Sequence, residues 1–234
     1  LLMAGQAAAA GNWLVTIGLK PLFPHTGLGY IHARKKWQKG VLKVIKFTEK
    51  PDLVKAKMFV KSGQYFWNAG MYIWSVTSGL KAFQAHAPRM AAGLEKILNA
   101  IATKKEQQVL KEIYEQAENI SIDYAISEKA KNMLVVPGDF GWSDIGDWKV
   151  VYDLGKKDKN GNVVIKHGEE GEYLAIDTKN CLIHFDDDLI ATVGVENLVI
   201  VDAGNLILVG NKNRAQDVKK IVLELKKRGK KEYL

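Results

Sequence analysis

The sequence contains a single cysteine, Cys181, among 234 residues. One cysteine cannot form an intramolecular disulfide, and no cysteine cluster is available to bind zinc. The neighbouring Leu182 and Ile183 favour a buried, inert thiol. No apolar run is long enough to cross a bilayer, and residues 1–10 lack the basic region and the longer apolar stretch of a signal peptide. We therefore expect a cytoplasmic protein without a membrane-spanning segment.

The composition allows a folded, positively charged protein. With 47% hydrophobic residues the chain can bury a core, as one large domain or as a domain with an appendage. The net charge of +8 could attract nucleic acid, membrane surfaces or phosphorylated small molecules, and its sign alone does not choose among them. A basic run near the C-terminus lies opposite an apolar stripe: Lys219, Lys220, Lys226, Lys227 and Arg228. This pattern is typical of a solvated helix face, so we expect no nucleic acid partner.

Strands and helices alternate in the first part of the sequence, which predicts a layered α/β domain. Apolar and β-branched runs predict strands at residues 13–18, 41–48 and 65–74, and helical spacing extends over residues 76–131. Asp52 can begin a short helix that ends at Gly63, and Ser121 is predicted to cap a helix over residues 122–126.

The pattern changes after a charged turn at residues 156–161. We place a domain boundary there, which gives domains 1–155 and 156–234. Six short, evenly spaced apolar runs predict a small β-rich domain: residues 163–165, 173–176, 181–183, 189–191, 198–201 and 206–209. An amphipathic helix over residues 218–225 follows, with Asn213 as its predicted cap.

Three segments carry residues suited to binding a sugar phosphate. Glu49 and Lys50 end a strand before Pro51, where a carboxylate could accept hydrogen bonds from sugar hydroxyls and an ammonium could neutralise a phosphate. An ordinary exposed strand end is the alternative. Asn68 lies among bulky apolar residues before Gly70, so its amide could bind a sugar or could be satisfied inside a bulge.

The third segment, residues 141–148, sets Asp144 between two glycines and two tryptophans. Its carboxylate could hold Mg²⁺ while the metal bridges phosphates, or it could merely cap the helix through Trp148. The glycine-rich loop at residues 24–31 could approach a ligand closely, but its spacing matches neither a Walker nor a Rossmann loop. Three consecutive acids at residues 186–188 are typical of a solvated turn, and we assign no metal to them.

Taken in order, five segments of the chain resemble mannose-1-phosphate guanylyltransferases: residues 26–31, 47–51, 66–71, 121–125 and 141–146. The resemblance continues through residues 196–202 and 214–219 and covers nearly the whole chain. It implies a Rossmann-like, three-layer nucleotidyltransferase domain of the α/β class. A small β-rich, β-helix-like domain that ends in a helix would follow.

The resemblance also implies roles for individual residues. Glu49 and Asn68 would bind the mannose, Lys50 its phosphate, the Gly29 backbone a sugar hydroxyl, and Asp144 one Mg²⁺. Lys50 and Asp144 would be the catalytic residues. The substrates would be mannose-1-phosphate and GTP, the products GDP-mannose and pyrophosphate, and a homodimer is compatible with the family.

The sequence departs from the family at its start. The glycine-rich, arginine-containing loop that grips the triphosphate and a second metal-binding aspartate are both missing before Trp13. We therefore expect an N-terminally truncated catalytic domain, without the region that recognises guanine. Two alternatives stay open: a non-catalytic sugar-phosphate-binding or regulatory subunit of the same fold, and a nucleotidyltransferase for another hexose-1-phosphate such as glucose-1-phosphate.

Overall fold

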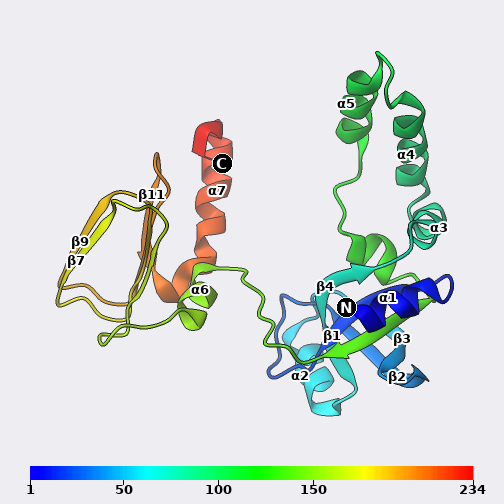
Figure 1. Cartoon of the computed structure of the whole chain (residues 1–234), viewed down its shortest axis with the longest axis horizontal. Helices are drawn as coiled ribbons and strands as arrows, with labels where there is room; N and C mark the ends of the chain where they lie inside the picture. Colours follow the sequence, from blue (N-terminus) through cyan, green and yellow to red (C-terminus); the bar gives the residue numbers. More distant parts are fainter. Residues whose placement is uncertain (234) are drawn as a thin grey trace. The chain divides into compact units, whose positions relative to one another are not determined.

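The computed structural model describes residues 1–233, which form two compact units (Figure 1). The first unit spans Leu1–Trp142 and the second begins at Ser143. The α/β class of the first part and the β-rich character of the second, both predicted from the sequence, are confirmed. No helix within residues 1–233 is long and apolar enough to span a membrane.

The first unit contains one sheet and several helices. Its strands are β1 (Leu14–Leu19), β2 (Tyr30–Gln38), β3 (Val41–Thr48), β4 (Tyr65–Ile73) and β5 (Met133–Gly138). Its helices are α1 (Leu2–Ala9), α2 (Leu53–Ser62), α3 (Val76–His86), α4 (Pro88–Ala100), α5 (Glu106–Gln116) and the single-turn π-helix η1 (Asp123–Ser127). Strands β2 and β5 were not predicted from the sequence.

The strand order of the first unit is β1-β4-β2-β3-β5. All strand pairs are antiparallel except β1 with β5. Because β5 also pairs with β3, over two residue pairs, the five strands form a closed ring of pairings. β2 pairs with both β3 and β4, so that Tyr30 lies between Thr48 and Trp67. This register brings the start of β2, the end of β3 and the middle of β4 to one place.

Helices cover both faces of these strands, because successive strand residues point to opposite sides. In β5, Leu134 and Val136 join a core with the alanines of α1 and with Ala56 of α2. Met133 and Val135 face a second core with Ala82 of α3 and with η1. The sheet thus lies between two helical layers.

Helix α2 follows its sequence signals closely. The side chain of Asp52 accepts a hydrogen bond from the backbone N–H of Lys55, and Gly63 ends the helix in the left-handed conformation, with φ of 65°. The prediction for Ser121 is wrong. Ile122 precedes η1 and no side chain caps it. Ser121 contributes only its backbone carbonyl, which accepts from the N–H of Ala125 at 2.9 Å.

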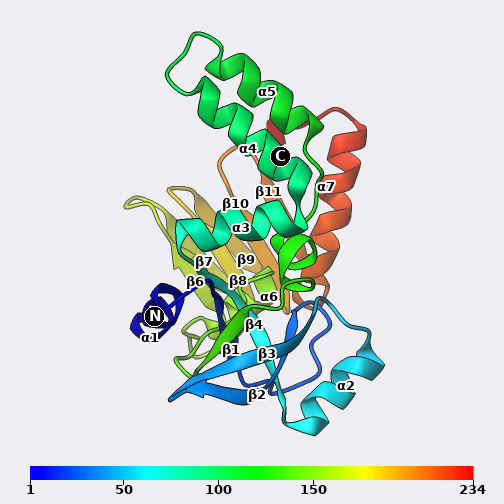
Figure 2. The ribbon, with the colours of Figure 1, turned by 90° about the vertical axis from the view of Figure 1, so that its right-hand side faces the viewer.

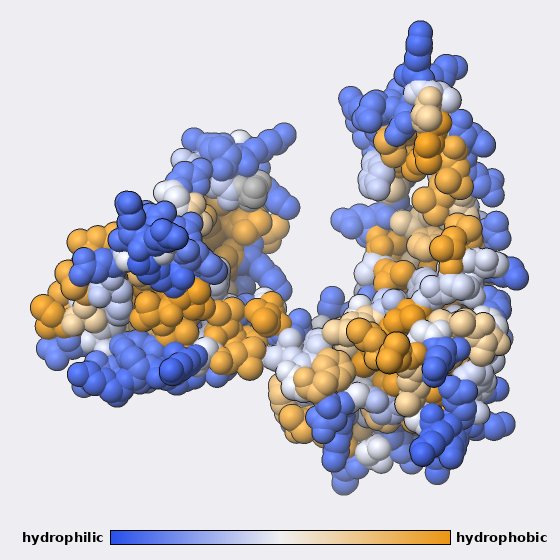
Figure 3. Space-filling view, in the orientation of Figure 1, coloured by the Kyte–Doolittle hydropathy of each residue, from blue (hydrophilic) through white to orange (hydrophobic). Residues whose placement is uncertain are grey.

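Helices α4 and α5 run side by side and extend away from the sheet (Figure 1 and Figure 2). Apolar side chains reach the surface along this pair (Figure 3). They include Leu98 at 60% exposure and Tyr114 at 74%. The pair therefore adds less to the core than α3 and η1, which pack directly on the strands.

The second unit is mainly β-structure. Its elements are α6 (Trp148–Leu154), β6 (Val163–Lys166), β7 (Glu172–Ile176), β8 (Leu182–Phe185), β9 (Leu189–Val193), β10 (Leu198–Asp202), β11 (Ile207–Asn211), the 3₁₀-helices η2 (Lys212–Asp217) and η3 (Lys231–Tyr233), and α7 (Val218–Lys227). Asn213 does not cap α7, contrary to expectation, because η2 intervenes and Asp217 precedes the helix.

Successive strands of the second unit alternate between two sheets. β6, β8 and β10 lie parallel in one sheet, and β7 and β9 lie parallel in the other, which is the winding of a β-helix. Cys181, Ile183 and Phe185 lie in the core that these coils enclose, so the predicted burial of Cys181 is confirmed.

Helix α6 belongs to the second unit by its packing. Tyr152 lies in a core with Val163 and Leu182, and its hydroxyl donates to the carbonyl of Gly161 at 2.8 Å. The compact units therefore divide before α6, whereas the predicted boundary follows it. The division into domains 1–155 and 156–234 stays a prediction from the sequence.

Gly18 in β1 tests how tightly the sheet is packed. A Cβ atom at this position would lie 2.5 Å from Cγ2 of Val135 and 2.9 Å from Cβ of Phe66. We expect Gly18→Ala to lower the free energy of unfolding by about 1–3 kcal/mol, since the core must shift to admit the methyl group. Urea denaturation followed by circular dichroism measures this change.

Gly5 in α1 provides the matched control. No atom lies within 4 Å of the position that a Cβ would take there. Gly5→Ala should therefore be neutral or stabilising by up to about 1 kcal/mol. Equal destabilisation by both substitutions would contradict the packing argument.

Candidate sugar-phosphate site

Four of the five residues predicted from the sequence come together in the first unit. Gly29 directly precedes β2, Glu49 and Lys50 directly follow β3, and Asn68 lies within β4. The backbone N–H of Asn68 donates to the carbonyl of Gly29 at 2.8 Å. The antiparallel register described above therefore assembles these segments, which lie far apart in the sequence.

Glu49 is the buried member of an acid–base pair. Its side chain is 8% exposed, and its Oε1 lies 3.5 Å from Nζ of Lys50, whose side chain is 57% exposed. The backbone N–H of Glu49 donates to Oε1 of Glu128 at 2.8 Å, which ties the end of β3 to the segment after η1. A buried carboxylate and the exposed ammonium paired with it thus lie next to each other.

Gly29 leaves room for the Glu49 carboxylate. A Cβ atom at position 29 would stand 2.6 Å from Oε2 of Glu49 and 2.9 Å from Cζ of Phe47. Any side chain at this position would displace one of them. Lys50 itself adopts a positive φ of 42°, which is uncommon for a residue other than glycine.

The surroundings of Glu49 disfavour its negative charge. Burial raises the pKa of Glu49 above its ordinary value, and the nearby Asp123 carboxylate raises it further. Lys50 acts in the opposite direction through its charge and its hydrogen bond. Hydrogen-bond donors from a ligand would stabilise the ionised form and would therefore be bound well here.

Asn68 is buried, and its amide is fully engaged as a donor. Its Oδ1 accepts from Oγ1 of Thr16 at 2.7 Å, and its Nδ2 donates to the Tyr72 hydroxyl at 3.2 Å and to Oδ1 of Asp123 at 3.1 Å. The Tyr72 hydroxyl donates to the same Oδ1 at 2.6 Å and lies 2.8 Å from Oγ of Ser127. Two donors, Asn68 Nδ2 and the Tyr72 hydroxyl, thus converge on one oxygen of Asp123.

Sequence reasoning assigned no role to Thr16, Tyr72, Asp123 or Glu128. Asp123 lies in one of the segments that carry the family resemblance, and this was the only signal available for it. In η1 the N–H of Glu128 bonds to the carbonyl of Asp123, five residues earlier. A π-turn of this kind has no simple sequence pattern. The hydrogen bonds that Asp123 and Glu128 make with Asn68 and Glu49 could therefore not be predicted.

Asp144 belongs to the second unit, whereas the cluster around Glu49 is confined to the first. The alternative that Asp144 caps the following helix is wrong, because Asp147 precedes α6 and accepts from the N–H of Val150 at 3.1 Å. Asp144 is exposed and has no hydrogen-bond partner within residues 1–233. A free carboxylate is a suitable single ligand for Mg²⁺, which takes its other ligands from water and phosphate oxygens.

No three acidic, histidine or cysteine side chains within residues 1–233 are grouped to hold a metal ion. The role of Asp144 as a metal ligand stays a prediction.

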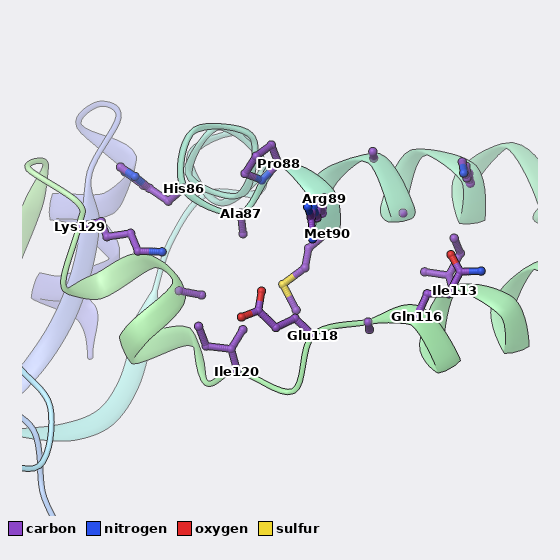
Figure 4. Close-up of a pocket in the computed structure, with 15 residues that line it drawn as sticks. His86, Ala87, Pro88, Arg89, Met90, Ile113, Gln116, Glu118, Ile120 and Lys129 are labelled. Carbon is purple, nitrogen blue, oxygen red and sulfur yellow. The ribbon is translucent and has the colours of Figure 1, made fainter.

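A cavity of about 710 Å³ lies elsewhere in the first unit, among α3, α4, α5 and η1. Met90 and Glu118 extend toward each other across it (Figure 4). None of the predicted site residues lines it. Because it lacks the Glu49–Lys50 pair and the Asn68 network, we assign the candidate site to that cluster and not to the cavity.

The raised pKa of Glu49 predicts a pH-dependent contribution to stability. From the ordinary value of 4.5 up to the raised value, the folded chain holds a proton that the unfolded chain has lost. The wild type should therefore lose stability relative to Glu49→Gln as the pH rises through this window, by at most about 1.4 kcal/mol per pH unit. Urea denaturation of both proteins from pH 4 to 8 measures the difference. If the unfolding free energy of the wild type minus that of Glu49→Gln stays constant or increases as the pH rises, the raised pKa of Glu49 is wrong.

Comparisons with known proteins identify the family of the chain. A family model described as "Nucleotidyl transferase" matches residues 2–161, and one described as "MannoseP isomerase/GMP-like beta-helix domain" matches residues 171–225. The mannose-1-phosphate guanylyltransferase of Escherichia coli is 36% identical over 231 residues, which are 97% of this chain and 48% of that protein. The mannose-1-phosphate guanylyltransferase of Klebsiella pneumoniae is 35% identical over 241 residues, with 99% and 49% covered.

A solved structure gives the same picture. The crystal structure of mannose-1-phosphate geranyltransferase from Thermus thermophilus aligns with a TM-score of 0.78 and 32% identity, over 96% of this chain and 63% of that one. The chain spans about half the length of the curated relatives it matches. The family model covers most of the sequence, and the chain belongs to the nucleotidyl transferase family.

Proposed function

We propose that this chain carries the sugar-phosphate half of a mannose-1-phosphate guanylyltransferase site. The observation that carries the proposal is the buried Glu49 carboxylate, which occupies the space beside Gly29 and lies next to the exposed Lys50 ammonium. The names of relatives at about 35% identity support mannose-1-phosphate as the sugar phosphate. The β-helix match over residues 171–225 supports the same family.

In this proposal each residue does what its surroundings favour. Sugar hydroxyls donate to Glu49, whose buried carboxylate lacks water and gains from each donor. Lys50 is free to turn its ammonium toward the phosphate because more than half of its side chain is exposed. The Gly29 backbone would contact a sugar hydroxyl, as the family resemblance implies.

The proposed reaction is transfer of a guanylyl group from GTP. A phosphate oxygen of mannose-1-phosphate attacks the α-phosphorus of GTP, the bond to the β-phosphate oxygen breaks, and pyrophosphate leaves with that electron pair. The products are GDP-mannose and pyrophosphate. Such chemistry requires in-line positioning and charge neutralisation more than a covalent intermediate, so a lysine that orients the attacking phosphate is a suitable catalytic group.

Asp144 would hold a Mg²⁺ ion in this proposal. When bound, Mg²⁺ supplies positive charge that neutralises the phosphate oxygens. We assign only the sugar-phosphate half to the residues discussed here, and GTP recognition is left to groups outside them. A cytoplasmic location, expected from the sequence, and a homodimer, compatible with the family resemblance, complete the proposal.

Calorimetric titration of the purified chain with mannose-1-phosphate and Mg²⁺ tests the proposal, with glucose-1-phosphate in parallel. We expect saturable binding that prefers mannose-1-phosphate and is lost in Glu49→Ala. Equal binding of glucose-1-phosphate would favour another hexose-1-phosphate as substrate. Absence of binding by a chain that circular dichroism shows to be folded would contradict the proposal.

Lys50→Ala should weaken mannose-1-phosphate binding about 10- to 100-fold, the range for a lost hydrogen bond to a charged group. Lys55→Ala is a matched control, because the Lys55 side chain is also 57% exposed and is paired with Asp52 at 2.9 Å. The control should retain wild-type affinity. Equal losses in both variants would indicate attraction by net positive charge instead of a defined phosphate contact.

A further inference from the structure

Asp123 is held in a way that leaves one carboxylate oxygen free. Its Oδ1 accepts from the Tyr72 hydroxyl at 2.6 Å and from Asn68 Nδ2 at 3.1 Å. Its Oδ2 has no hydrogen-bond partner among residues 1–233, although the residue is only partly exposed. A fixed carboxylate with one unpaired oxygen is ready to accept from a ligand.

The direction of the hydrogen bonds identifies Asp123 as the end point of the network. A tyrosine has one hydroxyl proton, and Tyr72 gives it to Asp123, so Ser127 must donate to Tyr72. Asn68 and Tyr72 therefore both donate to Asp123. Thr16 and Ser127 bond to Asn68 and Tyr72 in turn, so four groups form one network that ends at this carboxylate.

Asn68 has little capacity left for a sugar. An asparagine amide has two donor hydrogens, and Asn68 directs its Nδ2 to Tyr72 and to Asp123. Its Oδ1 already accepts from Thr16. The direct contact expected of Asn68 would require breaking this buried network, which costs free energy.

Asp123 is close to the predicted sugar-binding group. Its charge is one of the causes that raise the pKa of Glu49. Glu128, at the other end of η1, accepts from the backbone N–H of Glu49. The short π-helix η1 is thus joined to the end of β3, which keeps Asp123 near Glu49.

We propose that Asp123 is a second carboxylate that accepts hydrogen bonds from sugar hydroxyls beside Glu49, and that Asn68 and Tyr72 are positioning residues for it. This inference rests on the proposed function. The ligand class it defines is a pyranose phosphate with hydroxyl donors for two carboxylates. Two neighbouring acids repel each other in the empty site, and hydroxyl donors to both would relieve that repulsion when the sugar binds.

Asp123→Asn removes the charge at nearly constant size. Calorimetry should give a dissociation constant for mannose-1-phosphate about 10- to 100-fold higher than that of the wild type. Inorganic phosphate probes the Lys50 side alone, and its affinity should be unchanged or slightly increased, because a negative charge has been removed nearby. Equal weakening of both ligands would indicate general disruption and would overturn the inference.

Monodeoxy analogues of mannose-1-phosphate identify a direct contact. For one hydroxyl, removal should weaken binding to the wild type but cause no further loss in Asp123→Asn. If every deoxy analogue lowers the affinity of both proteins by the same factor, Asp123 makes no sugar contact and the inference fails. If the wild type itself does not bind mannose-1-phosphate, it is the proposed function that fails.

Tyr72→Phe keeps the ring and removes the donor to Asp123, so it tests the positioning role without removing the carboxylate. Mannose-1-phosphate should bind several-fold more weakly, with the same deoxy profile as the wild type and unchanged affinity for inorganic phosphate. Unchanged mannose-1-phosphate affinity would overturn the positioning role. This variant also keeps the inference testable if Asp123→Asn does not fold, which circular dichroism would reveal.

Discussion

The antiparallel pairing of β2 with both β3 and β4 is the constraint on which the rest of the candidate site depends. Tyr30 lies opposite Thr48 on one side and Trp67 on the other. Gly29, Glu49 and Asn68 each lie one residue beyond this row, so strand register alone brings them together. A slip of one residue would turn every side chain of a strand to the other face, and the buried apolar residues on both faces oppose it.

The site also concentrates acidic groups inside a protein whose net charge is +8. Glu49, Asp123 and Glu128 gather where two elements meet, and each has a defined role in hydrogen bonding. Acidic groups held close together repel one another unless donors compensate. Lys50, Tyr72 and the Asn68 amide supply these donors. Such an arrangement is unfavourable for stability alone but is suited to ligand binding.

The sequence was informative where the determinants are local. Asp52 and Gly63 define α2 because capping depends on neighbouring residues, and the alternating apolar runs located the coils of the β-helix. The motifs around Glu49 and Asn68 located the candidate site through family resemblance. Strands β2 and β5, by contrast, gave no sufficiently clear pattern. The contacts of Asn68 with Thr16 and Asp123 join residues more than fifty positions apart, so no local pattern indicates them. Ser121 was misassigned because its side chain makes no capping hydrogen bond and Ile122 precedes η1.

The backbone at Lys50 has a consequence for how this position can vary. Its left-handed conformation suits glycine or asparagine, and lysine is held there at a conformational cost of about 1 kcal/mol or more. Glycine would therefore relax the backbone and remove the ammonium in one step. Selection for thermostability would favour glycine at position 50, whereas selection for phosphate binding would favour lysine. The residue at this position in a homologue would therefore indicate which property had been selected.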